Sequence, residues 1–326
     1  MKLVQTEKIG SVDDYRVIEA PQPTPGADEV LIKVMVCGMG YVDALVALGG
    51  YQVKPPVPFT PGQEVAGIVE AVGAEVTTLK VGDRVMANSF GGGLAEFVVA
   101  KQFMVAATPE AMTYAQAAGF RINYITALHA LRDRAAIQPG ERLLVFGAAG
   151  GVGSAAIQVG NLLGAEVIAV GSTEAKRAFA RELGAKSAID TEADGWRERL
   201  KELCGGKGPD VIFDPVTGPL FEAAFRSLAW RGRHLIIGFA GGPIPKLPIN
   251  LTLMKGASLV GADVRQFLLY EQALAARHLA ELLGWVASGS LVPPVGREFQ
   301  FDDFADAMRF ATSGAGMAKT VICVGS

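Results

Sequence analysis

Residues 143–153 read Leu143-Leu144-Val145-Phe146-Gly147-Ala148-Ala149-Gly150-Gly151-Val152-Gly153, and this stretch decides the fold. An apolar run typical of a buried strand passes through small residues directly into helical periodicity over residues 152–163. Glycine lets a backbone approach a pyrophosphate closely, and the helix N-terminus offers free N–H groups and a positive dipole end. We interpret the stretch as a phosphate-binding turn. A tight structural turn is the alternative, but it does not require the complete strand, turn and helix.

Strand-like runs alternate with helical stretches on the C-terminal side of this turn. We expect strands at residues 142–147, 166–171, 186–190, 210–214, 234–239 and 258–262. We expect helices at residues 152–163, 176–183, 196–204 and 220–228. Such alternation indicates βαβ units on a parallel sheet. The sequence therefore predicts an α/β fold with a doubly wound Rossmann domain over residues 123–263.

The N-terminal third has a different pattern, in which short strand-like runs are broken by Pro and Gly. Runs at 29–34, 65–69 and 96–99 predict an antiparallel, β-barrel-type domain, with a short helix at 41–48. The tail offers a long helix within 267–287, a strand near Phe299, a helix at 304–311 and a strand at 320–324. We predict a first domain of residues 1–122, completed by residues 264–326, and a cleft between the two domains.

Composition excludes several classes of partner. The 30 Lys and Arg residues are balanced by 33 Asp and Glu residues, so no basic footprint for nucleic acid is present. Every apolar run is interrupted before the roughly 20 residues that a membrane helix needs, so we expect no membrane partner. Cys37, Cys204 and Cys323 have no pair spacing, and a reducing cytoplasm fits them best.

The end of the second strand decides which dinucleotide is expected. An NAD enzyme places a carboxylate about 20 residues beyond the turn, on the ribose 2′-hydroxyl. Here the strand ends at Gly171, and no Asp or Glu stands at its tip. A 2′-phosphate would fit the side chains of Ser172, Lys176 and Arg177. Glu174 argues for NAD instead, because a small loop shift would aim its carboxylate at the ribose. The sequence therefore predicts NADPH as the cofactor.

At this point the chain resembles the zinc-free branch of the medium-chain dehydrogenase/reductases, the quinone oxidoreductase or zeta-crystallin-like group. The likeness lies in Cys37-Gly38 through Asp43, Pro61-Gly62-Gln63-Glu64-Val65-Ala66-Gly67, Gly82-Asp83-Arg84-Val85, the turn ending at Gly153, and Gly238-Phe239-Ala240 followed by Asn250-Leu251. The resemblance implies a GroES-like catalytic domain, a Rossmann domain and a homodimer.

Zinc-dependent relatives carry a Cys and a His as catalytic ligands in the first domain. The matching positions here are Gly40 and Gln63, and neither suits zinc. The cysteine lobe that holds structural zinc in those relatives has no counterpart. We therefore predict no metal, and we expect structural roles for His129, His234 and His278.

Without a Lewis acid, the plausible chemistry is hydride delivery to an electron-poor acceptor such as a quinone or an α,β-unsaturated carbonyl. The resemblance implies that an Asn and a Tyr line the pocket, but this chain has Gly40 and Leu45 at those two positions. Asp43 and Tyr51 do match the residues that the family has at their positions. We assign Tyr51 as hydrogen-bond donor or nicotinamide neighbour, with a packed loop residue as the alternative. Tyr41 partly replaces what is missing, and Asp43 acts as a helix cap or scaffold residue rather than a base.

The resemblance and the strand ends together predict the cofactor contacts. Thr126 matches a family residue close to the cofactor, Lys319 resembles a family Lys that reaches it, and the end of the fifth strand binds ligands in open parallel sheets. The predicted contacts are Thr126, Ala148, Ala149, Gly150, Gly151, Val152, Gly171, Ser172, Lys176, Gly238, Phe239, Ala240 and Lys319.

Two other functions remain open from the sequence. One is an enoyl-thioester reductase acting on a carrier-bound substrate, which would need a basic rim for the carrier phosphate. The other is a non-catalytic protein that binds NADPH for stability alone. A screen of acceptors with purified protein separates the three.

Overall fold

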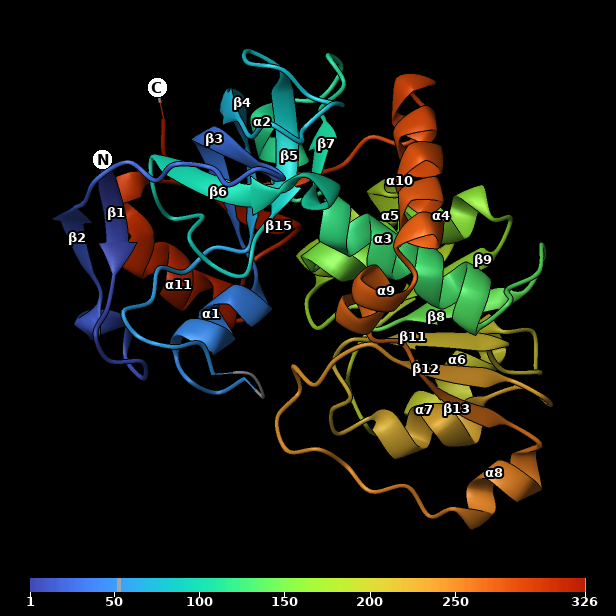
Figure 1. The fold of residues 1–326 in the computed structure, drawn as a ribbon. Coiled ribbons are helices and arrows are strands. Elements are labelled where there is room, and N and C mark those ends of the chain that lie inside the picture. The colour runs from blue at the N-terminus through green and yellow to red at the C-terminus, as the bar shows by residue number, and fades with distance from the viewer. Residues whose placement is uncertain (52–53, 326) are drawn as a thin grey trace. The chain divides into compact units, whose positions relative to one another are not determined.

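The chain folds into two compact units in the computed structural model, which describes residues 1–51 and 54–325 (Figure 1). Unit 1 comprises Met1–Ile122 and the tail from Val286, and unit 2 comprises Asn123–Trp285. Each unit has its own hydrophobic core. The GroES-like and Rossmann classes expected for the two parts correspond to unit 1 and unit 2.

One segment differs from the predicted domain division. Residues 264–285 belong to unit 2, so unit 1 is completed from Val286 and not from residue 264. The reason is packing on the π-helix at His129–Arg134: the ring of Phe267 stacks on His129 with 3.9 Å between centroids, and Arg132 pairs with Glu281. The expected long helix is also broken at Glu271, into α9 (Val264–Tyr270) and α10 (Gln272–Ala287).

Unit 2 is built on a six-stranded parallel sheet in the order β10-β9-β8-β11-β12-β13. In Figure 1 the strands from β9 to β13 follow one another down this unit. This order confirms the predicted doubly wound topology. The strands are β8 (Arg142–Val145), β9 (Glu166–Val170), β10 (Ser187–Ile189), β11 (Val211–Asp214), β12 (Arg233–Ile236) and β13 (Ser258–Gly261).

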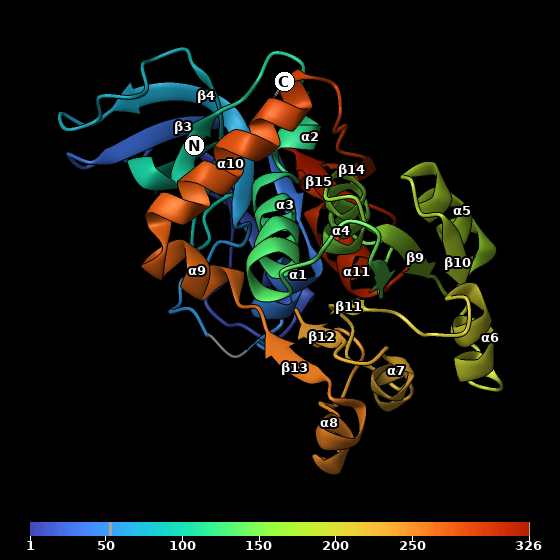
Figure 2. The same cartoon turned by 90° about the vertical axis from the view of Figure 1, so that its right-hand side faces the viewer.

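Helices cover both faces of this sheet. On one face, Trp196 and Phe225 pack with Ile168 and Ile212 in a fully buried cluster. On the other face, α4 lies so close to the strands that a Cβ at Gly160 would meet the side chain of Leu143 at 2.6 Å. Figure 2 shows α6 and α7 on the side of β11 and β12 away from α3. The remaining elements are α3 (Arg121–Leu128), the π-helix η3 (His129–Arg134), α4 (Gly151–Leu162), α5 (Glu174–Glu182), α6 (Trp196–Leu203), α7 (Phe221–Ser227) and α8 (Asn250–Lys255).

The turn between β8 and α4 brings two glycines into close backbone contact. Gly147 adopts a left-handed conformation with φ of 56°, which glycine tolerates without steric cost. A Cβ added at Gly153 would lie 2.1 Å from the carbonyl oxygen of Gly147. The N–H of Gly150 donates to the same carbonyl at 2.9 Å. The first turn of α4 therefore docks against the end of β8 with no room for a side chain at position 153.

Unit 1 is built on a mainly antiparallel seven-stranded sheet in the order β14-β15-β3-β4-β5-β7, with β6 also paired to β3. Bulges interrupt the long β3–β4 ladder, and such irregularities bend strands. A two-stranded sheet, β1 with β2, is tied to it through bridges from Leu3 to Ala95 and from Thr6 to Phe59. The strands are β1 (Lys2–Gln5), β2 (Arg16–Glu19), β3 (Glu29–Met39), β4 (Glu64–Val72), β5 (Arg84–Asn88), β6 (Phe97–Lys101), β7 (Val105–Ala107), β14 (Val295–Gln300) and β15 (Lys319–Cys323).

Short helices complete unit 1. Arg84 at the start of β5 places its guanidinium 4.8 Å from the ring centroid of Tyr114 and so attaches α2 to the sheet. Among the described residues, no helix combines the length and the apolar character that crossing a bilayer would require. The helices are η1 (Val12–Asp14), α1 (Tyr41–Ala47), η2 (Gln102–Met104), α2 (Tyr114–Ala117), η4 (Phe301–Asp303) and α11 (Phe304–Thr312).

Gly153→Ala tests the tight turn. The added methyl group forces the backbone of α4 away from Gly147, and overpacking of this kind costs about 1–3 kcal/mol. The matched control is Gly284→Ala, since Gly284 lies in α10 with nothing within 4 Å of the added Cβ. There the substitution raises the free energy of unfolding by about 0.5–1 kcal/mol through helix propensity. Urea unfolding measures both variants, and equal behaviour of the two would contradict the close approach.

Candidate coenzyme and acceptor sites

The glycine turn of unit 2 presents backbone amides at the carboxyl edge of the sheet. Ala148 and Ala149 are buried and Gly150 is half-buried, so backbone rather than side chains forms the outer surface of the turn. Helix α4 begins at Gly151, and the N–H groups of a first helical turn have no acceptor within the helix. The turn and the helix dipole together suit a diphosphate. The residues present therefore fit a dinucleotide.

Helix α3 closes one side of this turn. A Cβ at Gly151 would lie 2.9 Å from Nδ2 of Asn123, so the Asn123 amide sits against the start of α4. Thr126 follows one turn later on α3 and is 5% exposed. Asn123 was not among the predicted cofactor contacts, although its spacing of three residues from Thr126 places both side chains on the same face of the helix.

The tip of β9 carries cations, as the sequence predicted. Gly171 is buried, Ser172 is exposed and Lys176 is half-buried at the start of α5. The hydroxyl of Thr173 caps α5 by accepting from the Lys176 N–H at 3.3 Å. Arg177 donates from Nη1 to the carbonyl oxygen of Gly171 at 2.8 Å. Its guanidinium is therefore held at the strand tip by a backbone contact that the sequence pattern did not indicate.

Glu174, the carboxylate that could favour NAD by binding the ribose hydroxyls, is hydrogen-bonded to two arginines. Its Oε2 accepts from Nε of Arg177 at 3.0 Å, and its Oε1 accepts from Nη1 of Arg181 at 2.8 Å. The Arg181 and Arg177 hydrogen bonds hold the pKa of Glu174 below its usual range. The carboxylate that would read a ribose diol is therefore paired with two guanidinium groups.

The end of β12 is held by a buried polar network. Asp214 accepts from the N–H groups of Val216 and Thr217 at 2.9 and 2.7 Å, and its other oxygen lies 2.9 Å from Nε2 of His234. The Thr217 hydroxyl donates to the carbonyl oxygen of Gly238 at 2.6 Å. The structural role expected for His234 agrees with this position inside the sheet.

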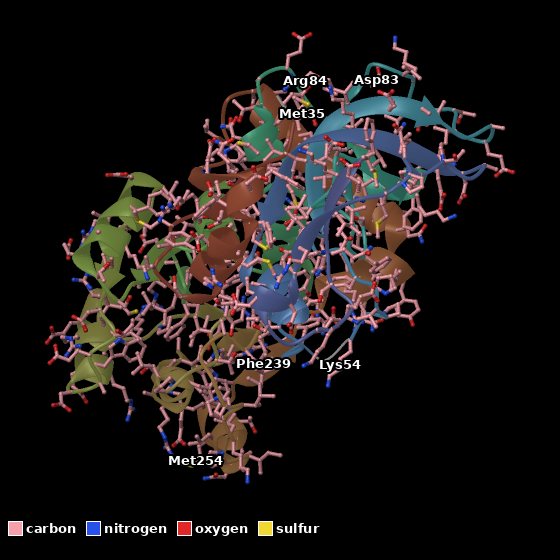
Figure 3. The ribbon with its side chains drawn as sticks, turned by 90° about the vertical axis from the view of Figure 1, so that its left-hand side faces the viewer. Met35, Lys54, Asp83, Arg84, Phe239 and Met254 are labelled. Atoms are coloured by element: carbon pink, nitrogen blue, oxygen red, sulfur yellow. The ribbon has the colours of Figure 1, made fainter. Side chains whose placement is uncertain are left out.

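The two predicted residues beyond Gly238 face outward. Phe239 is 38% exposed, and Ala240 is also exposed (Figure 3). The Ala240 N–H donates to the carbonyl oxygen of Pro215 at 3.2 Å. Residues 238–240 therefore lie at the carboxyl edge of the sheet, the edge at which open parallel sheets bind ligands.

In unit 1, Asp43 connects two loops. Its Oδ2 accepts from the Gly40 N–H at 2.8 Å and thereby caps α1, and its Oδ1 accepts from the Gln63 N–H at 3.0 Å. The side chain is 4% exposed. These contacts fit the scaffold role that we expect for Asp43.

Lys319 lies inside unit 1 between two carboxylates. Its Nζ is 2.7 Å from Oε2 of Glu64 and 3.4 Å from Oδ2 of Asp43. Burial alone would lower the pKa of Lys319, but Glu64 and Asp43 outweigh it and hold that pKa above its usual value. Burial also raises the pKa of the nearby Cys37 thiol, with Asp43 adding to the effect. Lys319 is therefore a compensated buried cation, and its predicted contact with the cofactor stays a prediction.

Tyr41 and Tyr51 lie on either side of Asp43 in sequence. Tyr41 is the first residue of α1 and is 36% exposed. Tyr51 is partly buried and packs against the hydrophobic core of unit 1. Both remain candidates for donating a hydrogen bond to an acceptor, and the packing of Tyr51 agrees equally with a structural residue.

The residues of unit 1 do not fit a catalytic zinc ion. Gly40 has no side chain, and a Cβ there would lie 2.8 Å from Nζ of Lys319, so an ammonium group borders the place of the missing ligand. Gln63 offers a neutral amide, which is not among the usual zinc ligands. Across residues 1–51 and 54–325, no three His, Cys, Asp or Glu side chains come together in a way that could hold a metal.

Lys319→Met tests the buried charge cluster. Removing the cation leaves two buried carboxylates without compensation, which costs about 3–5 kcal/mol. Glu64 and Asp43 hold the pKa of Lys319 above its usual value, so its stabilising charge is present throughout the range from about pH 6 to pH 9, and the deficit should be similar across that range.

The control for this substitution is Lys101→Met, which removes an exposed cation paired with Asp28 in the same unit. It should leave the free energy of unfolding close to that of the wild type. Urea titrations at several pH values measure both variants. A deficit for Lys319→Met that is no larger than that of Lys101→Met, or that disappears at some pH between about 6 and 9, would contradict the cluster's role.

Two family descriptions match the two units. Residues 26–110 match "Alcohol dehydrogenase GroES-like domain", and residues 151–280 match "Zinc-binding dehydrogenase". Quinone oxidoreductase-like protein 2 of Rattus norvegicus is 38% identical, over 88% of this chain and 82% of its own length.

Solved structures extend this likeness over the whole chain. Escherichia coli quinone oxidoreductase complexed with NADPH is 26% identical with a TM-score of 0.91, covering 99% of this chain and 100% of that one. The CurK enoyl reductase is 27% identical with a TM-score of 0.90, covering 99% of this chain and 98% of that one. Together with the fold and the absent zinc ligands at positions 40 and 63, these comparisons mean that the chain belongs to the zinc-free quinone oxidoreductase family of medium-chain dehydrogenase/reductases.

Proposed function

We propose that this protein is an NADPH-dependent reductase that transfers hydride to a quinone or an α,β-unsaturated carbonyl without a metal ion. The observation that carries the proposal is the tight Gly147–Gly153 turn, within a complete βαβ unit whose second strand ends beneath the Arg177 guanidinium. The NADPH complex of the Escherichia coli quinone oxidoreductase supports the same choice of coenzyme.

Unit 2 would hold the coenzyme by backbone and by charge. The first-turn amides of α4 bind the diphosphate, and Ser172, Lys176 and Arg177 bind the 2′-phosphate. Thr126 and residues 238–240 remain the proposed neighbours of the rest of the molecule. When bound, NADPH supplies a hydride for an electron-poor acceptor.

The class of hydride acceptor follows from the residues that stand at the zinc-ligand positions of unit 1. With Gly40 and Gln63 at the zinc-ligand positions, no Lewis acid is available to acidify an alcohol or polarise an unactivated carbonyl. A quinone or an enone is already electron-poor, so a hydrogen bond to the developing oxyanion suffices. We propose Tyr51, assisted by Tyr41, as that donor, with Asp43 fixing the loops at Gly40 and Gln63.

A second candidate is an enoyl-thioester reductase, favoured by the likeness to the CurK enoyl reductase. Both candidates reduce a double bond conjugated to a carbonyl, so they share the hydride step. They differ in the remote part of the substrate, since a carrier-bound thioester needs a cationic surface for the carrier phosphate.

An acceptor screen tests this proposal. Chelator-treated protein should oxidise NADPH with simple quinones or enones, at a rate unchanged by EDTA, and Tyr51→Phe should lower kcat about 10- to 100-fold if the hydroxyl stabilises the oxyanion. Absorbance at the NADPH band measures the rate. Turnover only with carrier-bound enoyl thioesters would select the second candidate. Binding of NADPH without turnover of any acceptor would select a non-catalytic role.

We also propose a homodimer formed through the outer edge of unit 2. Strand β13 pairs with β12 on one side and ends the described sheet on the other, which leaves an unpaired edge. Apolar side chains are exposed nearby on α8: Leu253 is 83% exposed and Met254 69%, and Ile249 just before the helix is 84% exposed (Figure 3). An edge strand beside exposed apolar residues suits pairing with a second copy.

Leu253→Glu tests the homodimer. A buried charge in the interface should convert the dimer into monomers, whereas Val81→Glu, at a 63% exposed position of unit 1, should leave it intact. Light scattering coupled to size exclusion measures the mass. A monomeric wild-type protein at micromolar concentration would contradict the proposal.

A further inference from the structure

Glu174, the first residue of α5 beyond the tip of β9, is paired with Arg177, one of the cations expected to bind the 2′-phosphate, and this pairing bears on the choice of coenzyme. Gly171 is what admits the arginine, because a Cβ there would lie 3.0 Å from Cγ of Arg177. The Arg177 side chain is 18% exposed and anchored on the Gly171 carbonyl, so the guanidinium stays at the strand tip.

The Glu174 carboxylate lies on this guanidinium in the manner of a bound anion. Its Oε2 accepts from Nε of Arg177 at 3.0 Å and lies 2.8 Å from Nη2, so one carboxylate oxygen occupies the guanidinium edge that arginine also offers to phosphate. Its second oxygen lies 2.8 Å from Nη1 of Arg181. The Glu174 side chain is 66% exposed, and exposed ion pairs contribute little, so the carboxylate can be displaced.

The other carboxylate at this edge is engaged with a different partner. Asp190, directly after β10, lies 2.8 Å from Nη2 of Arg199, and it also accepts from the Glu192 N–H at 2.9 Å. Arg177 also lowers the pKa of Asp190 through its charge, but Glu174 is the carboxylate that is hydrogen-bonded to Arg177 and so competes directly for it.

We propose that Glu174 is a specificity-determining residue that occupies Arg177 until the 2′-phosphate of NADPH displaces it. This inference rests on the proposed use of NADPH. A 2′-phosphate brings a larger negative charge and three acceptor oxygens to the guanidinium, so it replaces the carboxylate. NADH has no such group and leaves the Glu174–Arg177 pair in place. Glu174 therefore weakens the binding of NADPH and reduces the ratio by which the protein prefers NADPH to NADH.

Glu174→Gln tests the competition through coenzyme affinity. We expect the NADPH Kd to fall about three- to tenfold. Arg177 is then free of its competing carboxylate in every molecule, and the negative charge that repels the 2′-phosphate is gone. The NADH Kd should stay within twofold of the wild type. Calorimetric titration of the full-length, chelator-treated protein measures both values.

Two further variants make the result specific. Glu182→Gln removes the other, exposed carboxylate of α5 and should leave both Kd values unchanged, which controls for net charge. Arg177→Lys keeps a cation but loses the guanidinium edge, and it should weaken NADPH at least tenfold while sparing NADH.

The outcomes separate this inference from the proposed function. If NADPH binds the wild type but Glu174→Gln leaves its Kd unchanged or raises it, the inference alone is overturned. A loss of NADH affinity in Glu174→Gln would also overturn it, because Glu174 would then be reading the ribose hydroxyls. If the wild type binds neither coenzyme, the proposed function itself fails.

Discussion

The close backbone contact between Gly153 and the carbonyl oxygen of Gly147 is the constraint on which the account of unit 2 depends. It places the start of α4 directly beyond the end of β8 and leaves only backbone at the surface of the turn. The first N–H groups of α4, which begins at Gly151, have no acceptor within the helix and so suit a diphosphate at the carboxyl edge of the sheet. The Asp214–Thr217–Gly238 network and the Arg177–Gly171 contact fix neighbouring parts of the same edge.

Unit 1 depends on a balance of buried charges. Asp43 and Glu64 are carboxylates that would be costly to bury alone, and Lys319 compensates both. The same lysine borders the position of Gly40, where a zinc-binding relative carries a ligand. Residues 26–110 match the alcohol dehydrogenase GroES-like description, so unit 1 keeps this scaffold while Gly40 and Gln63 stand at the positions of the zinc ligands. This is the basis for proposing acceptors that need no metal.

Most of the fold could be predicted from the sequence because parallel strands and amphipathic helices leave strong periodic patterns. The six strands of unit 2 were each predicted within three residues of their observed bounds, and their order followed from the βαβ alternation. The weaker patterns failed: the break at Glu271 and the attachment of residues 264–285 to unit 2 depend on contacts of Phe267 and Glu281 with distant residues. Such contacts leave no local signal.

The parts of the candidate site that depend on backbone conformation could be predicted from the sequence. The parts that depend on side-chain contacts could be predicted less well. The glycine turn and the tip of β9 were located from spacing alone, and the choice against zinc followed from two residue types. The position of Arg177 on the Gly171 carbonyl, the Asn123 contact with Gly151 and the enclosure of Lys319 by two carboxylates depend on side-chain geometry. No motif contains that information.

The central claim is that the glycine turn binds the diphosphate of NADPH in a protein free of metal. Hydrogen–deuterium exchange of chelator-treated protein, with and without NADPH, tests this most directly at the level of single amides. The account predicts slower exchange at the amides of Gly151, Val152 and Gly153 when NADPH is bound. Unchanged exchange at these three amides under saturating NADPH would contradict it.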